Sequence, residues 1–286
     1  MQQESGYVLS TVRLEELRWP EVRQYLAHKD IVVVPAGAVE QHGFHLPLGT
    51  DAMVAIQLAL DAGRDVGVVV APPVWYGWSP HHMAYPGTVS LQPDTLISVV
   101  NDVCLSLVQH GFRKIVIVNG HRQANLAPLQ IAAAAVRQRT GAYVAIVDPF
   151  LIGELAARRL RRSAPGGIGH ADELETATMM VIRPDLVDRA SLVRNVPPAS
   201  PFHQGDPYVE ADRVVVPPTV EEFRRRGGET GVVGDATTAD EVMGREYYRA
   251  LLDNLVAFIR GLETDAGRAD SAGDGQGSCC ARSRRG

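Results

Sequence analysis

Short polar segments hold the side chains that could do chemistry. In the first, VEQHGFHLPLGTD (residues 39–51), Glu40 and His42 are two residues apart, so in an extended chain both side chains point to the same side. Asp51 follows at the start of a predicted helix, where its carboxylate could reach the same crevice or simply cap the helix. The segment offers ligands for a metal ion, although an isolated Glu-x-His pair is more often surface or capping chemistry.

Two further segments supply more imidazole and carboxylate groups. The segment NGHRQAN (119–125) places His121 just after a predicted strand, at the sheet edge where open parallel sheets bind ligands. The segment GHADELETATMM (169–180) supplies His170, Asp172, Glu173 and Glu175. In a helix the side chains of Glu173 and Glu175 diverge by about 200°, so at most one of them faces a site shared with the other segments.

The ligand types in these segments indicate divalent cations. Carboxylates and imidazoles without thiolates favour Zn²⁺, Mn²⁺ or similar ions, and three carboxylates with two imidazoles are enough for two ions bridged by one carboxylate. Two ions about 3.5–4 Å apart would hold a water as hydroxide near neutral pH and polarise a substrate oxygen, so hydrolysis is the natural reaction. The cysteines, Cys104, Cys279 and Cys280, fit neither a disulfide framework nor a paired CxxC zinc site.

The elements that must position these residues alternate between strands and helices. Short β-branched runs predict buried strands at 31–35, 66–72, 114–120 and 142–148. Segments with helical spacing and length lie between them, at 52–64, 94–110 and 124–140. This series predicts an α/β protein with a mostly parallel central sheet covered by helices. The polar segments meet at one edge of that sheet if their strands are neighbours.

The rest of the chain continues the same domain up to residue 263, and the tail that follows has few apolar residues. Helices are predicted around 150–162, in the second half of 163–180 and at about 238–261, whereas the Pro- and Gly-rich stretch 190–235 is predicted to be mostly loop. No clean domain boundary is evident, which favours one domain over residues 1–263. The tail, residues 264–286, has almost no apolar content, and we expect it to be disordered.

The composition excludes several classes of protein. The chain has 286 residues, of which 45% are hydrophobic, enough for a sizeable core. A formal net charge of -5 gives no basic field for a nucleic acid or an anionic membrane surface. No apolar run is long enough to span a membrane, and the N-terminus MQQESGYVLS lacks the pattern of a signal peptide. We therefore expect a soluble, cytoplasmic protein with neither a nucleic acid nor a membrane as its partner.

The ordered motifs resemble those of the creatininase (creatinine amidohydrolase) family. The resemblance rests on PAGAVEQHGFHLPLGTD, PGTVSL, NGHRQAN, GHADELETATMM and GVVGDATTA, which follow one another over roughly residues 25–260. Several spaced motifs in this order are far more specific than any one of them. The resemblance implies a three-layer α/β/α sandwich in a single domain, a binuclear metal centre, hydrolysis of an amide C–N bond and frequent assembly into hexamers.

Carried over by position, the resemblance implies a set of metal ligands. The implied ligands are Glu40, Asp51 and His121 for one ion, and His42 with the bridging Asp51 for the other. Creatininase itself has a glutamate two residues after the histidine of the NGH motif, where this chain has Gln123. Other members use the first glutamate of the later motif, so Glu173 is the expected fifth ligand and is counted with His170 as catalytic. His170 would move a proton to the leaving nitrogen.

Departures from the family pattern concern the substrate. The usual NGHGGN has become NGHRQAN, so Arg122 could pair with a carboxylate or phosphate of the substrate or simply lie on the surface. No tryptophan occurs between 150 and 175, although the resemblance predicts substrate-stacking tryptophans there in true creatininases, and this disfavours creatinine itself. The loop 75–88 carries further candidates for substrate contact, Trp78, His82 and Tyr85; a packed surface loop is an equal alternative.

Two further residues are expected behind the ligands. His45 follows the first ligand pair closely and is predicted to orient a ligand by hydrogen bonding rather than to bind metal. Glu175 is given a similar supporting role, because helix phase lets only one of the two neighbouring glutamates face the ions.

Three functions are compatible with the sequence. The first is a metal-dependent amidohydrolase with two Zn²⁺ or Mn²⁺ ions per chain, in which a metal-bridging hydroxide attacks a small amide, in particular a cyclic one. The second is a catalytically silent metal-binding or scaffolding subunit, in which Arg122 and Gln123 plug the pocket. The third is a family hydrolase that cleaves the C–C bond of a cyclic ketone. We expect a homo-oligomer, a hexamer by family resemblance.

Overall fold

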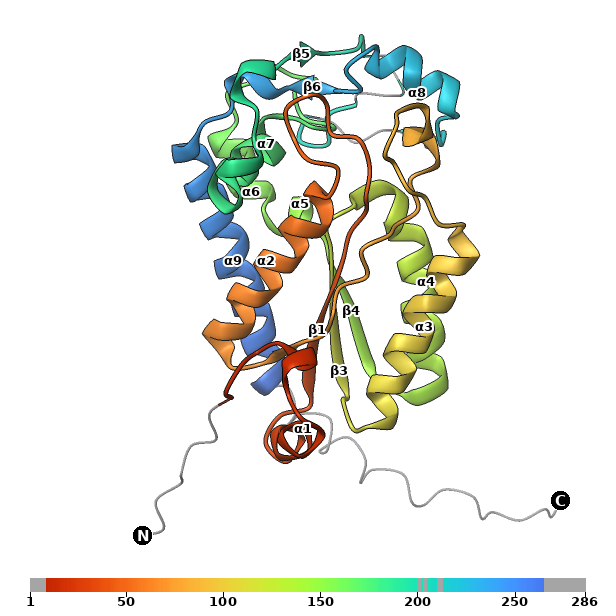
Figure 1. Ribbon diagram of the computed structural model, residues 1–286, viewed down its shortest axis with the longest axis vertical. Coiled ribbons are helices and arrows are strands. Elements are labelled where there is room, and N and C mark those ends of the chain that lie inside the picture. Colours follow the sequence, from red (N-terminus) through yellow and green to blue (C-terminus); the bar gives the residue numbers. More distant parts are fainter. Residues whose placement is uncertain (1–8, 200–201, 203–204, 210–212, 265–286) are drawn as a thin grey trace, which may run out of the picture.

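A parallel sheet runs through the centre of the molecule (Figure 1). The computed structural model describes residues 9–199, 202, 205–209 and 213–264. Within them the central sheet has the order β2–β1–β3–β4, formed by β1 (Ile31–Ala36), β2 (Val69–Val70), β3 (Lys114–Asn119) and β4 (Tyr143–Val147). A separate antiparallel pair consists of β5 (Arg194–Asn195) and β6 (Gly234–Asp235). Three of the four predicted strands are confirmed within one residue at each end, and the fourth, β2, is shorter than predicted.

Helices cover both faces of this sheet. The longer helices are α2 (Thr50–Val66), α3 (Pro93–Gln109), α4 (Arg122–Thr140), α7 (Glu173–Ile182) and α9 (Glu241–Thr264). The shorter helices are α1 (Trp19–Leu26), α5 (Pro149–Ile152), α6 (Glu154–Leu160) and α8 (Val220–Gly227). Single 3₁₀ turns are η1 (Leu14–Glu16), η2 (Pro80–Ala84), η3 (Pro184–Leu186), η4 (Arg189–Ser191) and η5 (Ala236–Thr238). Because α2, α7 and α9 pack together on one face and α3 packs with α4 on the other, the predicted three-layer α/β/α sandwich is confirmed (Figure 1).

The strand side chains alternate between the two helical layers. Ile31 and Val33 of β1 join the core shared with α2 and α9, whereas Val32 and Val34 join the core shared with α3 and α4. The neighbouring strand β3 repeats this alternation. Burial on both faces explains why these strands are continuous apolar runs rather than alternating ones.

One prediction about the second half of the chain needs correction, and another holds for most of its residues but missed a helix. The helix predicted around 150–162 is broken into α5 and α6 at Gly153, where a Cβ atom would lie 2.5 Å from Leu251 of α9. The stretch 190–235, predicted to be mostly loop, contains α8. Its sequence signal is a capping box: the hydroxyl of Thr219 accepts from the main-chain N–H of Glu222, whose carboxylate accepts from the N–H of Thr219.

The C-terminal helix α9 packs along α2 and α7 and ends at Thr264. The tail predicted to be disordered begins there, and residues 265–286 lie outside the described part of the chain. Among the helices of the described residues, none is both long and apolar enough to cross a membrane.

Glycines let the beginning of α2 approach the sheet closely. A Cβ atom at Gly120 would lie 2.1 Å from the carbonyl oxygen of Asp51, and one at Gly37 would lie 2.3 Å from Cα of Ala52. These close approaches place the first turn of α2 directly on the carboxyl ends of β1 and β3. Asp51 and the residue that follows Gly120, His121, are therefore neighbours in space.

The contact at Gly120 yields a prediction. We expect Gly120→Ala to push Asp51 away from His121, to lower the free energy of unfolding by about 1–3 kcal/mol and to reduce bound metal. Gly261→Ala is the matched control, because a Cβ atom there meets open space in α9 and alanine favours a helix by about 1 kcal/mol over glycine. Thermal unfolding and elemental analysis of both variants test this; unchanged metal content in Gly120→Ala would contradict it.

Candidate metal centre

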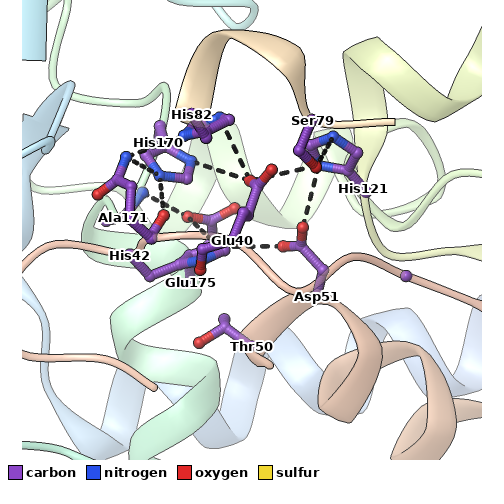
Figure 2. A network of polar contacts seen from close by, with 12 residues as sticks. Glu40, His42, Thr50, Asp51, Ser79, His82, His121, His170, Ala171 and Glu175 are labelled. Carbon is purple, nitrogen blue, oxygen red and sulfur yellow. Dashed lines mark hydrogen bonds and ion pairs between the residues drawn. The ribbon is translucent and has the colours of Figure 1, made fainter. Parts of the chain in front are cut away.

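Carboxylates and imidazoles from distant segments meet at the carboxyl edge of the sheet (Figure 2). Atoms within coordinating distance of one another form three groups among the described residues: Glu40, Asp51 and His121; His42, His170 and Glu175; and Glu40, His82 and His170. They come from the loop after β1, the first turn of α2, η2, the turn after β3, and the segment around the start of α7. The structure thus brings Glu40, His42, Asp51 and His121 together, because β1 and β3 are neighbours.

The carboxylate of Asp51 lies between two imidazoles. Its Oδ1 is 3.0 Å from Nε2 of His42, and its Oδ2 is 3.0 Å from Nδ1 of His121. Oε1 of Glu40 is 3.3 Å from that same nitrogen of His121. All four residues are buried. Ligand atoms at 2.0–2.1 Å from a tetrahedral Zn²⁺ lie about 3.3 Å apart, so this spacing is that of atoms around a common ion.

Main-chain carbonyls fix the orientation of both imidazoles. Nδ1 of His42 is 3.1 Å from the carbonyl oxygen of Glu40, and Nε2 of His121 is 3.2 Å from that of Trp78. A carbonyl oxygen only accepts hydrogen bonds, so these two nitrogens carry protons. In the neutral rings the opposite nitrogens then turn lone pairs toward Asp51. Metal-ligating histidines show this arrangement, in which the second nitrogen donates to a carbonyl.

The cluster holds uncompensated negative charge. Among the described residues, Oε2 of Glu40, Nε2 of His42 and Oδ2 of Asp51 are buried without a hydrogen-bond partner. Burial alone would lower the pKa of His42, but the charge of Asp51 outweighs it and raises the pKa to about 10. The pKa of His121 is likewise well above its usual value, despite burial, because of Glu40 and Asp51. The raised pKa values show that the carboxylates draw positive charge to the two imidazoles. Divalent cations in place of those protons would supply the positive charge and leave the rings neutral, so the residues present fit divalent cations.

Glu175 reaches the cluster from α7. Its Oε2 is 3.9 Å from Nε2 of His42 and accepts a hydrogen bond of 2.6 Å from the N–H of Ala171. Burial, followed by the charge of Asp172, raises the pKa of the Glu175 carboxyl to about 8. Asp172 caps α7 by accepting from the N–H groups of Leu174 and Glu175, which fixes where the helix begins and hence its phase.

Glu173 lies on a different side of α7, and the expectation that it is the fifth ligand needs correction. Its buried carboxylate accepts hydrogen bonds from the N–H groups of Arg162 and Ser163 and from the hydroxyls of Ser163 and Thr238. It therefore ties α7 to the preceding loop and to η5. Glu175, predicted to play only a supporting role, occupies the place expected for Glu173. The sequence offered one signal that could have separated the two glutamates. The D-E-L-E pattern at 172–175 is typical of a capped helix start, and the cap sets the phase of the helix.

His170 lies at the solvent-facing side of the cluster. Its side chain is 12% exposed and that of Glu175 is 13% exposed, whereas those of Glu40, His42 and Asp51 are at most 4% exposed. Nδ1 of His170 is 3.7 Å from Oε1 of Glu40. Burial and then the nearby His42 hold the pKa of His170 well below its usual value. His170 and Glu175 are therefore the more accessible members of the cluster.

The backbone next to His170 is unusual. Ala171 has a φ of +50°, and it is the one residue other than glycine with positive φ in the described part of the chain. The preceding residue pairs with Val233 in an isolated antiparallel bridge, through hydrogen bonds of 2.7 and 3.0 Å. The turn at Ala171 therefore redirects the chain from this bridge into α7, with His170 on one side and Glu175 on the other. Such backbone strain is common at functional sites.

His82 belongs to the cluster itself rather than to a substrate wall alone. Its Nε2 is 3.4 Å from Oε1 of Glu40, and burial together with His170 holds its pKa well below the usual value. His45 lies behind the cluster: its Nε2 is 2.9 Å from the hydroxyl of Thr176 in α7. Burial and the nearby His42 lower the pKa of His45 to about 4. His45 thus supports the helix that carries Glu175, and among the described residues its side chain hydrogen-bonds Thr176 rather than a candidate ligand, contrary to the prediction.

Two of the side chains predicted to contact the substrate make contacts within the protein instead. The side chain of Trp78 packs against the core on the α3 and α4 face, and it is the carbonyl of Trp78 that contacts His121. The hydroxyl of Tyr85 donates to the carbonyl of Gly228 at 2.7 Å, and its ring packs edge-on against Phe223 of α8. Both side chains therefore brace the loop 75–88 instead of pointing into the cluster.

Arg122 is also paired within the protein. Its Nε is 3.4 Å from Oδ2 of the buried Asp148, and its guanidinium lies 5.5 Å from the ring centre of Phe150. A cavity of 30 Å³ lies nearby, bounded by Asp51, Glu175 and Phe150 among other residues. This volume holds about one or two water molecules.

Comparison with known proteins identifies the family of this chain. A sequence model of the creatininase family, described as creatinine amidohydrolase, matches residues 15–259. The chain belongs to the creatininase family. It is a hydrolase of that family, as the sequence predicted, and the cluster is its candidate metal-binding site.

Relatives within the creatininase family carry different names. The chain is 28% identical to 3-dehydro-scyllo-inosose hydrolase of Thermotoga maritima, over 91% of this chain and 85% of that one. It is 27% identical to creatinine amidohydrolase of Pseudomonas putida, over 77% and 90% of the two chains. It is 30% identical to mycofactocin precursor peptide peptidase of Mycolicibacterium smegmatis, over 85% and 90%.

Solved creatininase structures confirm the fold. A structure titled "Creatininase Mn" has a TM-score of 0.74 at 25% identity, and a mutant creatininase of the "Zn-Zn type" has a TM-score of 0.76 at 25% identity. Each comparison covers 88% of this chain and 98% of the other.

The two glutamates of α7 should respond differently to the same substitution. We expect Glu173→Gln to lower the free energy of unfolding by about 1–3 kcal/mol, since an amide nitrogen would face buried donors, while metal content stays unchanged. We expect Glu175→Gln to lose metal with a smaller effect on thermal unfolding of the metal-free protein. If Glu173→Gln released metal and left unfolding unchanged, Glu173 would be the ligand after all.

Proposed function

We propose that this chain hydrolyses an amide C–N bond of a small molecule with two divalent cations. The observation that carries the proposal is the carboxylate of Asp51, whose two oxygens each lie 3.0 Å from a different imidazole nitrogen. A carboxylate in this position would bridge two ions. The ligands would be Glu40, His121 and Asp51 for one ion, and His42, Glu175 and Asp51 for the other.

Zn²⁺ and Mn²⁺ are the ions that suit this donor set of carboxylates and imidazoles. The titles of the solved creatininase structures, which name manganese and zinc, support the same choice. When bound, two such ions would lower the pKa of a water molecule and polarise the oxygen of the bond to be cleaved.

His170 is the residue placed to move protons. Its imidazole lies at the exposed side of the cluster and directs Nδ1 inward. It would accept the proton released by the attacking water and then donate that proton to the departing nitrogen, so the amine leaves neutral and the carbonyl carbon keeps the water oxygen as a carboxylic acid, which then loses its remaining proton to solvent. Phe223 packs 6.0 Å from the ring of His170 and limits its movement.

The substrate class follows from the relatives and from the surroundings of the cluster. By their names, creatinine amidohydrolase and mycofactocin precursor peptide peptidase cleave amides, which supports an amide substrate here. A cyclic amide is the favoured form, although the chain lacks tryptophan between 150 and 175, which disfavours creatinine. The inosose hydrolase, related over 91% of this chain, supports the second candidate, a cyclic ketone cleaved at a C–C bond.

The remaining alternative is a silent subunit in which Arg122 and Gln123 plug the pocket. The pairing of Arg122 with Asp148 weakens it, because the guanidinium is held at the side chain of Asp148 and over Phe150. A homo-oligomeric state, with the hexamer as its implied form, and a cytoplasmic location stay predictions of the sequence.

Asp51 provides the first test of the proposal. We expect the wild-type protein to bind two ions per chain and Asp51→Asn to lose both, together with turnover, because one carboxylate serves both ions. Asp94→Asn, on the exposed first turn of α3, is the control and should keep both. Elemental analysis, and chelation followed by Zn²⁺ or Mn²⁺ addition, measure this; two ions retained in Asp51→Asn would reject the bridging role.

His170 provides the second test. We expect His170→Asn to keep both ions and to lower kcat by about 10²–10⁴-fold, the usual contribution of general acid–base catalysis. The substrate for this assay comes from a screen of lactams, cyclic ureas, formamides, short peptides and cyclic ketones, with product analysis to identify the bond cleaved. Loss of an ion in His170→Asn would instead identify His170 as a ligand.

A further inference from the structure

Gln41, between the candidate ligands Glu40 and His42, is buried and its side-chain amide has a fixed orientation. Its Oε1 accepts a hydrogen bond of 3.0 Å from the N–H of Gly43, and its Nε2 donates one of 3.0 Å to the carbonyl of Gly231. One partner can only donate and the other can only accept. The positions of the amide oxygen and nitrogen of Gln41 therefore follow from the main chain.

The main-chain carbonyl of Gln41 determines the proton on His170. This carbonyl oxygen lies 2.7 Å from Nε2 of His170. Because a carbonyl oxygen only accepts, Nε2 of His170 carries a hydrogen. In the neutral ring Nδ1 is then unprotonated, and Nδ1 is the nitrogen that faces the cluster, 3.7 Å from Glu40.

The side-chain amide of Gln41 determines the proton on His82. Its Nε2 has two hydrogens, and one of them is donated in a hydrogen bond to the carbonyl of Gly231. The same nitrogen lies 2.9 Å from Nδ1 of His82 and 2.9 Å from Nε2 of His170. Since Nε2 of His170 already carries a hydrogen, the second amide hydrogen goes to Nδ1 of His82. His82 then has its proton on Nε2, the nitrogen 3.4 Å from Oε1 of Glu40.

We propose that Gln41 is a positioning residue that gives His82 and His170 opposite roles. Both imidazoles have the same tautomer, but they turn opposite edges to the cluster. His82 directs an N–H at Glu40 and orients that carboxylate, whereas His170 directs a lone pair at the reaction space and can accept a proton there. Phe223 holds the rings in these orientations, with its centre 4.4 Å from His82 and 6.0 Å from His170.

A glutamate at position 41 would reverse this control of His82. A carboxylate has no hydrogen to donate, so it would require a proton on Nδ1 of His82. His170 would keep its proton on Nε2, because the main-chain carbonyl of residue 41 is unchanged. The two imidazoles therefore respond differently to one substitution, which a general loss of structure would not produce.

The experiment measures ring protons directly. Protein labelled with ¹⁵N-histidine and loaded with Zn²⁺ is examined by NMR, with ring signals assigned by comparison with His82→Asn and His170→Asn. In the wild type we expect protonated Nε2 and unprotonated Nδ1 on both residues. In Gln41→Glu we expect Nδ1 of His82 to gain a proton while Nε2 of His170 keeps its own. Gln130→Glu, on the exposed face of α4, should match the wild type.

The same variants separate positioning from substrate binding. With a substrate from the screen, we expect Gln41→Glu to lower kcat by about tenfold or more with little change in KM, because His82 would no longer direct an N–H at Glu40 and that carboxylate would lose its orientation. Thermal unfolding checks that the variant is folded. An unprotonated Nε2 on His170, or a protonated Nδ1 on His82, in the wild type would overturn the inference even if no variant folds.

This inference depends on the proposed function only for the catalytic use of His170. The NMR measurement requires no turnover, so the two can fail separately. A protein with the expected ring protons but no hydrolase activity would reject the proposed function alone, and an active enzyme with other ring protons would reject the role of Gln41 alone.

Discussion

The structure depends on one electrostatic constraint: a buried cluster of carboxylates that requires positive charge beside it, from protons on the imidazoles or from bound cations. Charged groups removed from water are stable only when they are paired and hydrogen-bonded. Around Asp51 the pairing within the protein is incomplete, because atoms of Glu40, His42 and Asp51 have no hydrogen-bond partner among the described residues. Cations at the centre of the cluster would supply the missing attraction, so binding of the ions and stability of this edge of the sheet are coupled.

The fold holds the members of this cluster in place with its most rigid parts. The neighbouring parallel strands β1 and β3 deliver the loop of Glu40 and the turn of His121 to the same edge. Gly120 allows α2 to rest on that edge, which brings in Asp51. Main-chain carbonyls then orient the imidazoles, so the arrangement does not depend on flexible side chains. A preorganised site of this kind costs little further reorganisation when it binds ions.

The contacts that surround the candidate ligands give similar residues different roles. Of two glutamates in one turn of α7, Glu173 closes the contact between the helix and its neighbouring loops, and Glu175 faces the cluster. Of two imidazoles beside Glu40, His82 and His170 present opposite edges, which Gln41 determines. Relatives in the creatininase family act, by name, on different substrates.

The sequence by itself determined the strands, the layers of the sandwich and the group formed by Glu40, His42, Asp51 and His121. Apolar periodicity fixes these elements locally, and strand order brings their ends together. The tertiary structure decided which glutamate of α7 faces the cluster, that Trp78 acts through its carbonyl, and that His82 and Gln41 belong to the site. These outcomes depend on helix phase and ring orientation, which are set by contacts with segments far away in the chain, such as Ser163 for Glu173 and Gly231 for Gln41. No local pattern contains that information, because each contact forms only when the whole sheet edge is assembled.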